Sequence, residues 1–296
     1  MPGMLATVLA AALVQALAPV APAAAHAAPP PAAKAPPAPV VAPATPPPAA
    51  QQAPWQALEP GLDVADLQGP PADGDRKITV VRIDPTRFEL RLLSASAPGE
   101  GGPRTARAWA YRSGASATIN AAMYQEDYRT SVSLMRSREH MNQRRVSKDK
   151  AVLAFDPLVS GVPPVRIVDR ECESLDDAAV RYATLVQSIR MVSCDRRNVW
   201  APSDRRFSAA AIGVDRRGRV LFVHARTPWP IHELVAALLA LPIDLAQAMY
   251  VEGGPEAQVF ARGGSREVER VGTFEGTGEN LRAWPVPNVV AAIRRK

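Results

Sequence analysis

The sequence predicts an α+β fold: a mixed, largely antiparallel sheet with a few packed helices, in a single domain that follows a disordered Pro/Ala-rich leader. Three observations support this prediction. Strand-like segments outnumber helix-like ones, and short turns separate some of them. About half of the 30 prolines lie in the first 60 of the 296 positions, so a hydrophobic core is expected only downstream of them.

The strand-like segments are spread along the whole downstream part. Residues 78–83 and 88–93 alternate apolar and polar side chains around a turn at Asp84-Pro85, which predicts a β-hairpin. A second hairpin is predicted at 208–214 and 219–224, around the turn 215–218. Further strands are expected at 117–123, 132–135, 151–155, 165–168, 186–192, 248–251, 258–261 and 286–293.

Three helices are predicted from the residues at their ends. Thr105 is placed to cap a short helix that Gly114 stops. Ser174 precedes a helix whose first turn carries two aspartates, which are favourable at the positive end of the helix dipole. Pro230 and Pro242 bound a third helix over 231–241. With so few helices among many strands, a regular βαβ series is excluded.

The N-terminal region indicates export. Residues 5–18 form an almost uninterrupted apolar run, too short for a bilayer crossing of about 20 residues. An Ala-His-Ala sequence at 25–27 matches a signal-peptidase site. We therefore expect a signal peptide over 1–27, a disordered Pro/Ala-rich linker over 28–54 and the folded domain over 55–296. The mature chain would have no membrane span and would be periplasmic or extracellular; an uncleaved N-terminal anchor is the alternative.

The charge balance is basic but interleaved. There are 35 Lys and Arg against 29 Asp and Glu, yet no basic run of five and no aromatic-rich RNA motif, so no nucleic-acid partner is expected. Cys172 and Cys194 are the only cysteines, and in an oxidising compartment such a pair favours a disulfide. Their spacing is wrong for a zinc site and no cofactor motif occurs, so neither a metal nor a cofactor is predicted.

The segment 248–257 is the best candidate for chemistry. A strand with a buried-type sequence ends at Glu252, and Gly253 and Gly254 then let the backbone turn and a ligand approach closely. Glu256 follows four residues after Glu252, so two carboxylates can share one site and divide the acid and base roles. An ordinary turn is the alternative interpretation of this Gly-Gly-Pro sequence.

Five segments match the motifs of one known family in order. They are TINAAMY at 118–124, SVSL at 131–134, QSIRMV at 187–192, AAAIGV at 209–214 and VEGGPE at 251–256. The first resembles INxGMF and the last resembles LDGGxS of the phosphodiester glycosidase family, the bacterial relatives of N-acetylglucosamine-1-phosphodiester alpha-N-acetylglucosaminidase. The resemblance covers residues 76–260, and it depends on the order and spacing of short motifs.

The resemblance implies one cleft, lined by the residues that match the motifs: Asn120, Gln187, Ser188, Glu252, Gly253 and Gly254. The chain departs from the family at several positions, one of them Arg190, where the family often has Pro. Glu252 replaces the family Asp, Glu256 replaces the family Ser, and Ala209 replaces the family Arg. The cation that would bind the phosphate is thus missing from its usual place, and the candidates to replace it are Arg190, Arg205, Arg206 and Arg226.

Two main functions follow as hypotheses. The first is a secreted glycosidase that hydrolyses a sugar-1-phosphodiester bond in envelope or extracellular glycans; the resemblance implies the activity, and the N-terminal region implies the secretion. In this hypothesis Glu252 and Glu256 are the catalytic carboxylates. The substrate is bound by the other cleft residues together with Arg190 and Arg226. The alternative is a catalytically inactive relative that binds polysaccharide at the cell surface, which the loss of Ser and Arg favours. A surface-displayed scaffold is a third, generic possibility.

Overall fold

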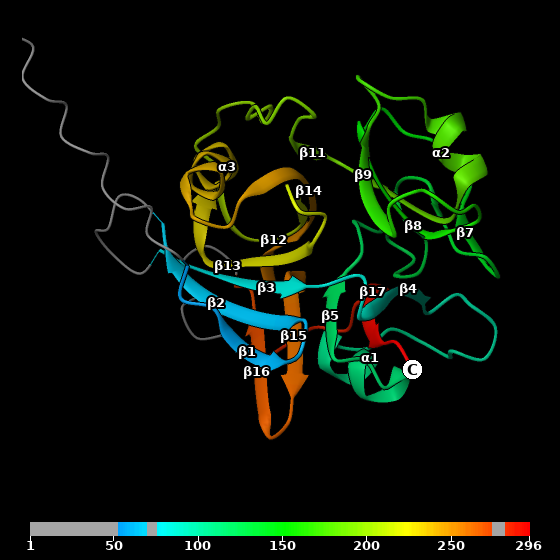
Figure 1. Ribbon diagram of the computed structural model, residues 1–296, viewed down its shortest axis with the longest axis horizontal. Coiled ribbons are helices and arrows are strands. Elements are labelled where there is room, and N and C mark those ends of the chain that lie inside the picture. Colours follow the sequence, from blue (N-terminus) through cyan, green and yellow to red (C-terminus); the bar gives the residue numbers. More distant parts are fainter. Residues whose placement is uncertain (1–52, 70–75, 274–281) are drawn as a thin grey trace, which may run out of the picture. The chain divides into compact units, whose positions relative to one another are not determined.

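Three β-sheets and three short α-helices make up the computed structural model, which describes residues 53–69, 76–273 and 282–296 (Figure 1). These residues belong to one compact unit, Ala49–Lys296. The predicted signal peptide and nearly all of the predicted linker lie outside the described residues. Every strand pair in the described part is antiparallel, which confirms the predicted α+β class with a largely antiparallel sheet.

The largest sheet has seven strands in the order β1-β2-β3-β13-β12-β14-β11. Their bounds are Gln56–Glu59, Leu62–Gln68, Lys77–Ile83, Val220–Pro230, Arg206–Asp215, Leu245–Gly253 and Arg190–Val192 respectively. Side chains of β12 and β13 alternate between two buried faces, as expected for central strands. Helix α3 (Ile231–Ala240) packs on one of these faces through Leu234 and Leu238.

Two five-stranded sheets complete the unit. One has the order β7-β6-β10-β8-β9 and is accompanied by α2 (Leu175–Arg181), at the upper right of Figure 1. Its strands are Met141–Gln143, Met135–Arg136, Tyr182–Ser188, Ala151–Pro157 and Val165–Asp169. The other has the order β16-β15-β5-β17-β4 and is covered by α1 (Ala106–Ser113). Its strands are Arg266–Val271, Gln258–Gly263, Ala117–Asn120, Asn288–Arg294 and Phe88–Ser94.

The three sheets share one hydrophobic core. Phe222 of the large sheet, Leu153 of the second and Ile119 of the third belong to the same buried cluster, and each is almost fully shielded from solvent. Burial of apolar side chains from all three sheets therefore holds them together. Because the three sheets pack together, side chains at the ends of strands from different sheets can lie close enough to form one site.

The first predicted hairpin is wrong, whereas the second is confirmed. Residues Asp84–Arg87 do turn the chain, but β3 pairs with β2 and β13, while β4 pairs with β17 in another sheet. Both strands have buried apolar side chains, and the long-range partners supply more buried contact than the local turn does. The hairpin β12–β13 forms around Asp215, whose carboxylate accepts hydrogen bonds from the backbone N–H groups of Arg217 and Arg219.

The helix ends agree with the sequence prediction. Thr105 and Ser174 cap α1 and α2 through side-chain hydrogen bonds, and Gly114 ends α1 in a left-handed conformation at φ 71°. Pro230 is the N-cap of α3, one position earlier than the first-turn place expected for it. Within residues 53–69, 76–273 and 282–296, no helix has the length and hydrophobicity that a membrane crossing requires.

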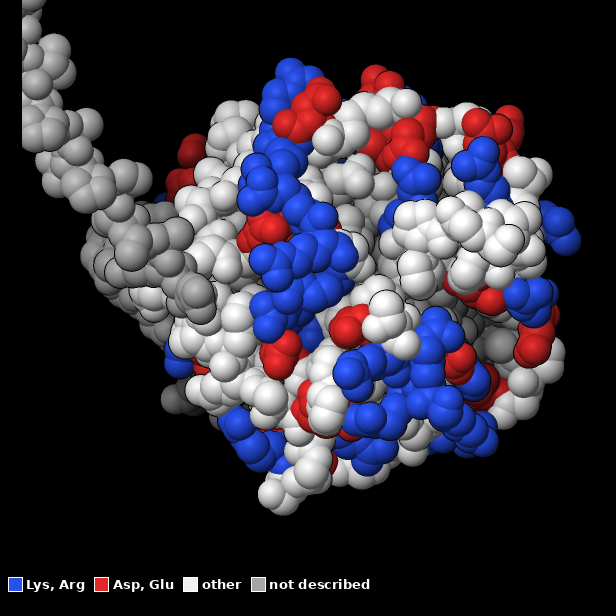
Figure 2. Space-filling view, in the orientation of Figure 1, with Lys and Arg blue, Asp and Glu red and all other residues white. Residues whose placement is uncertain are grey.

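Charged residues are interleaved on the surface as well as along the sequence. Figure 2 shows Lys and Arg gathered in two groups on the face in view, each with Asp and Glu beside it. Many charged side chains of the described residues form ion pairs, such as Arg107 with Glu267 at 2.8 Å and Arg138 with Asp156 at 2.7 Å. The basic net charge is therefore largely compensated locally, at the level of individual pairs.

Candidate active site

Glu252 lies where β14 leaves the large sheet. The strand pairs with β12 through a bulge, and Glu252 stands opposite Ala210. The chain then turns through a 3-10 helix, Gly254–Glu256. Gly253 is needed because a Cβ there would lie only 2.3 Å from the Tyr250 hydroxyl, and Gly254 adopts φ 63°, which favours glycine. The two glycines therefore fix the position of Glu252 at the end of a rigid strand.

Glu252 and Glu256 form an interacting pair of carboxyl groups. Burial raises the pKa of Glu252 to about 7; the Gly253 N–H, 3.1 Å from Oε1, opposes the shift, and the charge of Glu256 adds to it. Burial also raises the pKa of Glu256, against the effects of its own backbone N–H and of the Tyr124 hydroxyl. The two carboxyls therefore lie close enough for the charge of Glu256 to act on Glu252.

Tyr124 brings a phenol to the two carboxyls. Its hydroxyl hydrogen-bonds the side chain of Glu256, and its pKa is raised by burial and by the charges of Glu256 and Glu252. The phenol therefore stays protonated and donates to Glu256. The Tyr124 ring packs against Tyr128 with centroids 5.4 Å apart, and Tyr128 is itself more than half exposed. An aromatic surface of this kind suits the apolar face of a sugar ring.

Asn120 and Ser188 support the site from both sides. Asn120, at the end of β5, accepts the backbone N–H of Gln258 at 3.2 Å through Oδ1, which anchors the chain just after the 3-10 turn. Its Nδ2 is buried and has no partner among the described residues. The Ser188 hydroxyl donates to the carbonyl oxygen of Tyr250 in β14. Asn120 therefore retains an unused donor next to the site, while Ser188 uses its hydroxyl to hold the strand.

The Gln187 side chain binds the backbone just before β6 and after β7. Its Oε1 accepts from Ser147 N at 3.0 Å and from Leu134 N at 3.3 Å. Its Nε2 donates to the carbonyl oxygens of Ser147 and Asp149, at 3.1 Å and 2.7 Å. Every hydrogen-bonding atom of this buried amide is thus engaged within the protein, which fits a role in fixing the chain just before β6 and after β7.

Arg190 is paired with a buried aspartate. Its Nη1 lies 2.6 Å and 2.8 Å from the two carboxylate oxygens of Asp169, whose side chain is only 1% exposed. Burial opposes ionisation of Asp169, but the hydrogen bonds from Arg190 and from the backbone outweigh it and lower the pKa. The Arg190 guanidinium therefore neutralises the Asp169 carboxylate within the protein.

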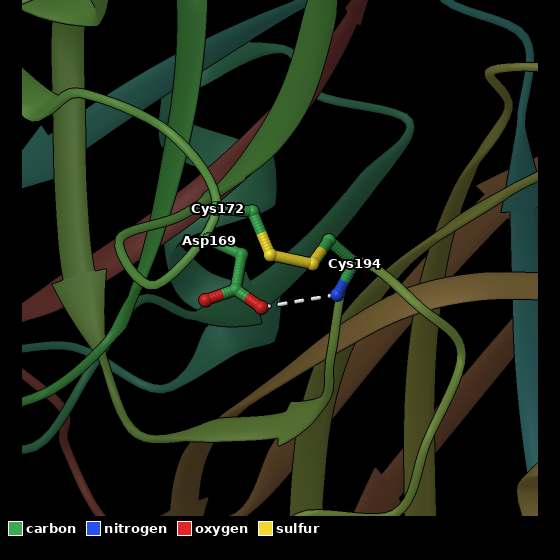
Figure 3. A group of neighbouring side chains, drawn as sticks. All are labelled: Asp169, Cys172 and Cys194. Carbon is green, nitrogen blue, oxygen red and sulfur yellow. Dashed lines mark hydrogen bonds between the residues drawn. A yellow bond between two sulfur atoms is a disulfide. The ribbon is translucent and has the colours of Figure 1, made fainter.

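The predicted disulfide lies beside this ion pair. Figure 3 shows Cys172 bonded to Cys194, with the Cys194 N–H donating to Asp169 at 3.0 Å. The bond joins the chain after β9 to the chain after β11, and so links two sheets. The two sulfurs and the Asp169 carboxylate are close enough to resemble a metal site. A metal requires thiolates, however, and these sulfurs are bonded to each other.

Arg226 lines a cavity of about 330 Å³ whose lining does not include Glu252 or Glu256. The segment 252–256 and Tyr124 thus lie together. Asn120 and Ser188 bind the backbone next to that segment. Gln187 and Arg190, in contrast, use their side chains for contacts within the protein.

Sequence reasoning missed Tyr124, Tyr250 and Asp169 as parts of this region. Tyr124 ends the segment that resembles INxGMF, at the position of its aromatic residue, so the motif itself contained the signal. Tyr250 precedes Glu252 by two residues, and its ring packs against Trp200 with centroids 5.3 Å apart. No local pattern identifies Asp169, because its partner Arg190 is 21 residues away.

Comparison with known proteins identifies the family and the fold. The sequence pattern of the family described as phosphodiester glycosidase matches residues 113–293. No curated protein matches the chain. One similar solved structure is the catalytic domain of zebrafish N-acetylglucosamine-1-phosphodiester alpha-N-acetylglucosaminidase, auto-inhibited by its pro-peptide, with TM-score 0.59 and 11% identity over 83% of this chain and 87% of that one. Another is a hypothetical protein from Synechocystis, with TM-score 0.57 and 14% identity over 83% of this chain and 64% of that one.

Proposed function

The chain belongs to the phosphodiester glycosidase family, and we propose that it is an exported enzyme that hydrolyses a sugar-1-phosphodiester bond in envelope or extracellular glycans. The observation that carries the proposal is the pair of coupled carboxyls at the end of β14, with the Tyr124 phenol bound to one of them. A similar fold in the zebrafish glycosidase supports the architecture, and the catalytic assignment comes from the residues themselves.

The two carboxyls suit the chemistry of glycosidic bond cleavage. With a pKa of about 7, Glu252 is close to half protonated at neutral pH, so it can both donate and accept a proton. Glu256 receives a hydrogen bond from Tyr124, which favours its ionised form. A carboxylate next to the anomeric carbon stabilises the oxocarbenium-like transition state, and the phosphodiester leaving group needs little protonation.

Substrate contacts come from groups whose hydrogen bonds are not used within the protein. The unpartnered Nδ2 of Asn120 is a donor for a sugar or phosphate oxygen. Gly253 and Gly254 have no side chains between the carboxyls and a sugar ring, so the backbone can approach the substrate closely.

A specific observation favours a second candidate function, a catalytically inactive relative that binds polysaccharide. Ala209 stands at the position of the family Arg, and Arg190 is held by Asp169, so neither neutralises a phosphate in this structure. A site with two carboxyls and aromatic rings but without such a cation is better suited to neutral sugar than to a phosphodiester.

One assay separates the two functions. The purified domain is incubated with a panel of sugar-1-phosphodiesters, and release of the reducing sugar is measured. We expect hydrolysis by the wild type and a loss of at least about 100-fold for Glu252→Gln, the scale of one well-placed electrostatic group. No hydrolysis of any phosphodiester, together with binding of a neutral polysaccharide, would replace the first proposal with the second.

Export is part of the same proposal. The apolar run 5–18, the Ala-His-Ala sequence at 25–27 and a disulfide that needs oxidising conditions all support it. Expressing the full chain in a bacterium and sequencing the N-terminus of the periplasmic product tests it, with Ala28 the expected first residue. A product that keeps Met1 and stays with the membrane would favour the uncleaved anchor. Stable expression of residues 55–296 alone would support the proposed domain boundary.

A further inference from the structure

A basic cavity lies between β3, β13 and β16. Its volume is about 330 Å³, at the lower end of the range of about 300–1,000 Å³ for small-molecule sites, which suits one small ligand. Among the described residues, its lining consists of Lys77, Thr79, His224, Arg226, Thr227, Glu269, Arg270 and Val271. Three of these side chains are cationic and one is anionic.

The positive charge of the cavity is only partly compensated. Arg270 is paired with Asp66 at 3.1 Å and donates to Thr79 at 3.0 Å, and Glu269 is paired with Arg107 at 3.5 Å. Lys77 and Arg226, in contrast, form no ion pair with any described carboxylate. Two cations without a counter-charge among the described residues, at one cavity, favour a ligand that carries an anionic group.

His224 also lines this cavity, and its ring has an unused acceptor. Its side chain is 1% exposed, and its Nε2 lies 3.1 Å from the carbonyl oxygen of Ala257. Because a carbonyl can only accept, Nε2 carries the proton and Nδ1 is an acceptor. Nδ1 is buried and unpartnered among the described residues. Burial lowers the pKa of His224 to about 4, and the charges of Arg270 and Arg226 act in the same direction, so the ring is neutral.

The two cations and the unpartnered imidazole nitrogen together indicate which chemical groups a ligand of this cavity would carry. A buried acceptor without a donor is rare in proteins, and a hydroxyl group of a ligand would satisfy it. A fully deprotonated anion offers no donor to a neutral imidazole, inorganic phosphate offers a hydroxyl but no ring to fill the cavity, and a neutral sugar offers no negative charge to Lys77 and Arg226. A sugar residue with an anionic substituent offers both groups at once.

We propose that this cavity is a second binding site, for an anionic sugar residue, in which Arg226 and Lys77 bind the anionic group and Nδ1 of His224 accepts a sugar hydroxyl. The anionic group is a phosphate or a carboxylate, as in a phosphosugar or a uronic acid. The site is lined by different residues from the Glu252 pair, and the inference does not depend on hydrolysis by that pair.

The test measures binding directly, by titration calorimetry of the folded domain. The probes are glucose 1-phosphate, glucuronate, inorganic phosphate and glucose. We expect one or both sugar anions to bind at least about tenfold more tightly than inorganic phosphate or glucose, and Arg226→Gln to weaken that binding about tenfold, as the loss of a charge-assisted contact implies. The tighter of the two sugar anions identifies the substituent. Long-range ¹H–¹⁵N spectra should show the Nδ1 signal of His224 shifting on binding.

Arg217→Gln is the matched control, because Arg217 is an exposed arginine in the turn between β12 and β13, at the other end of β13 from Arg226. Lys77→Gln is a second test, since Lys77 is exposed and its replacement leaves the buried core unchanged. Three results would overturn the proposal: no binding of either sugar anion, equal weakening by Arg217→Gln and Arg226→Gln, or inorganic phosphate binding as tightly as glucose 1-phosphate.

Discussion

Replacing Glu252 with Gln should change how the stability of the protein depends on pH. Burial raises the pKa of Glu252 from 4.5 to about 7, so between these values the folded state holds a proton that the unfolded state has released. The stability that this group contributes is therefore complete below pH 4.5 and is lost as the pH rises through 7. The glutamine amide cannot ionise, so the variant keeps its stability over the same range.

The size of the effect follows from the shift itself. A change in pKa from 4.5 to about 7 corresponds to about 3 kcal/mol of free energy of unfolding, since each pH unit is about 1.4 kcal/mol. The negative charge of Glu256 contributes to the raised pKa of Glu252. Because the two carboxylates repel each other, removing one of them makes ionisation of the other easier. The stability difference between the variant and the wild type should thus grow by about 3 kcal/mol in favour of the variant as the pH rises from 4.5 to about 8.

Urea unfolding at several pH values measures this difference. Glu139→Gln is a suitable control, because Glu139 is an exposed carboxylate without an ion pair in the described part of the chain. The control should follow the wild type at every pH. If the stability of Glu252→Gln declined with pH as steeply as that of the wild type, Glu252 would not have a raised pKa. Its assignment as the protonatable member of the pair would then fail.

Three further predictions concern the framework of the site. Replacing both Cys172 and Cys194 with Ala should lower stability by about 3 kcal/mol, measured by urea unfolding, because the bond closes a loop with a separation of 22 residues. Arg190→Gln should lower stability by about 3 kcal/mol or more at pH 7 by leaving buried Asp169 without its counter-charge, and acidification should reduce this loss as Asp169 is protonated. Gly272→Ala should lower the melting temperature by several degrees, because its Cβ would lie 2.0 Å from a backbone oxygen of the 3-10 turn.

Each of these predictions has a direct check. Gly102→Ala is the control for the glycine variant, since a Cβ at Gly102 would meet nothing within 4 Å. Arg197→Gln is the control for the ion pair, because Arg197 and its partner Asp195 are both well exposed. Two free thiols in the unfolded, unreduced protein would contradict the disulfide. An Arg190 variant as stable as the Arg197 variant would show that Asp169 does not depend on Arg190.

The parts of the fold that the sequence predicted well are set by local interactions. Thr105 and Ser174 cap their helices with their own side chains, and the turn at Asp215 is held by hydrogen bonds two and four residues ahead. The pairing of β3 and β4 is different in kind. It depends on which strands hydrogen-bond to the edges of β3 and β4, and a turn sequence carries no information about that.

The site divides in the same way. Glu252, Gly253 and Gly254 belong to one short segment, so the sequence could place them together. The contact of Tyr124 with Glu256 joins the chain after β5 to the chain after β14, and the pairing of Arg190 with Asp169 joins two sheets. Such contacts exist only after the sheets have packed. This is why Arg190 looked available for a substrate in the sequence and is engaged in the structure.

The structure also explains why Ala209 cannot simply be changed back to the Arg of the family. Ala209 is 1% exposed, pairs with Ala225 and Gly253, and lies in an apolar cluster with Tyr250. Tyr250 belongs to the same buried apolar cluster, so an arginine side chain at position 209 would have to displace packed apolar side chains. Ala209→Arg should therefore lower stability by about 3 kcal/mol or more and should not raise phosphodiester hydrolysis. A stable Ala209→Arg protein with increased hydrolysis would show instead that the space is open to a cation, and that this chain has lost activity through that one substitution.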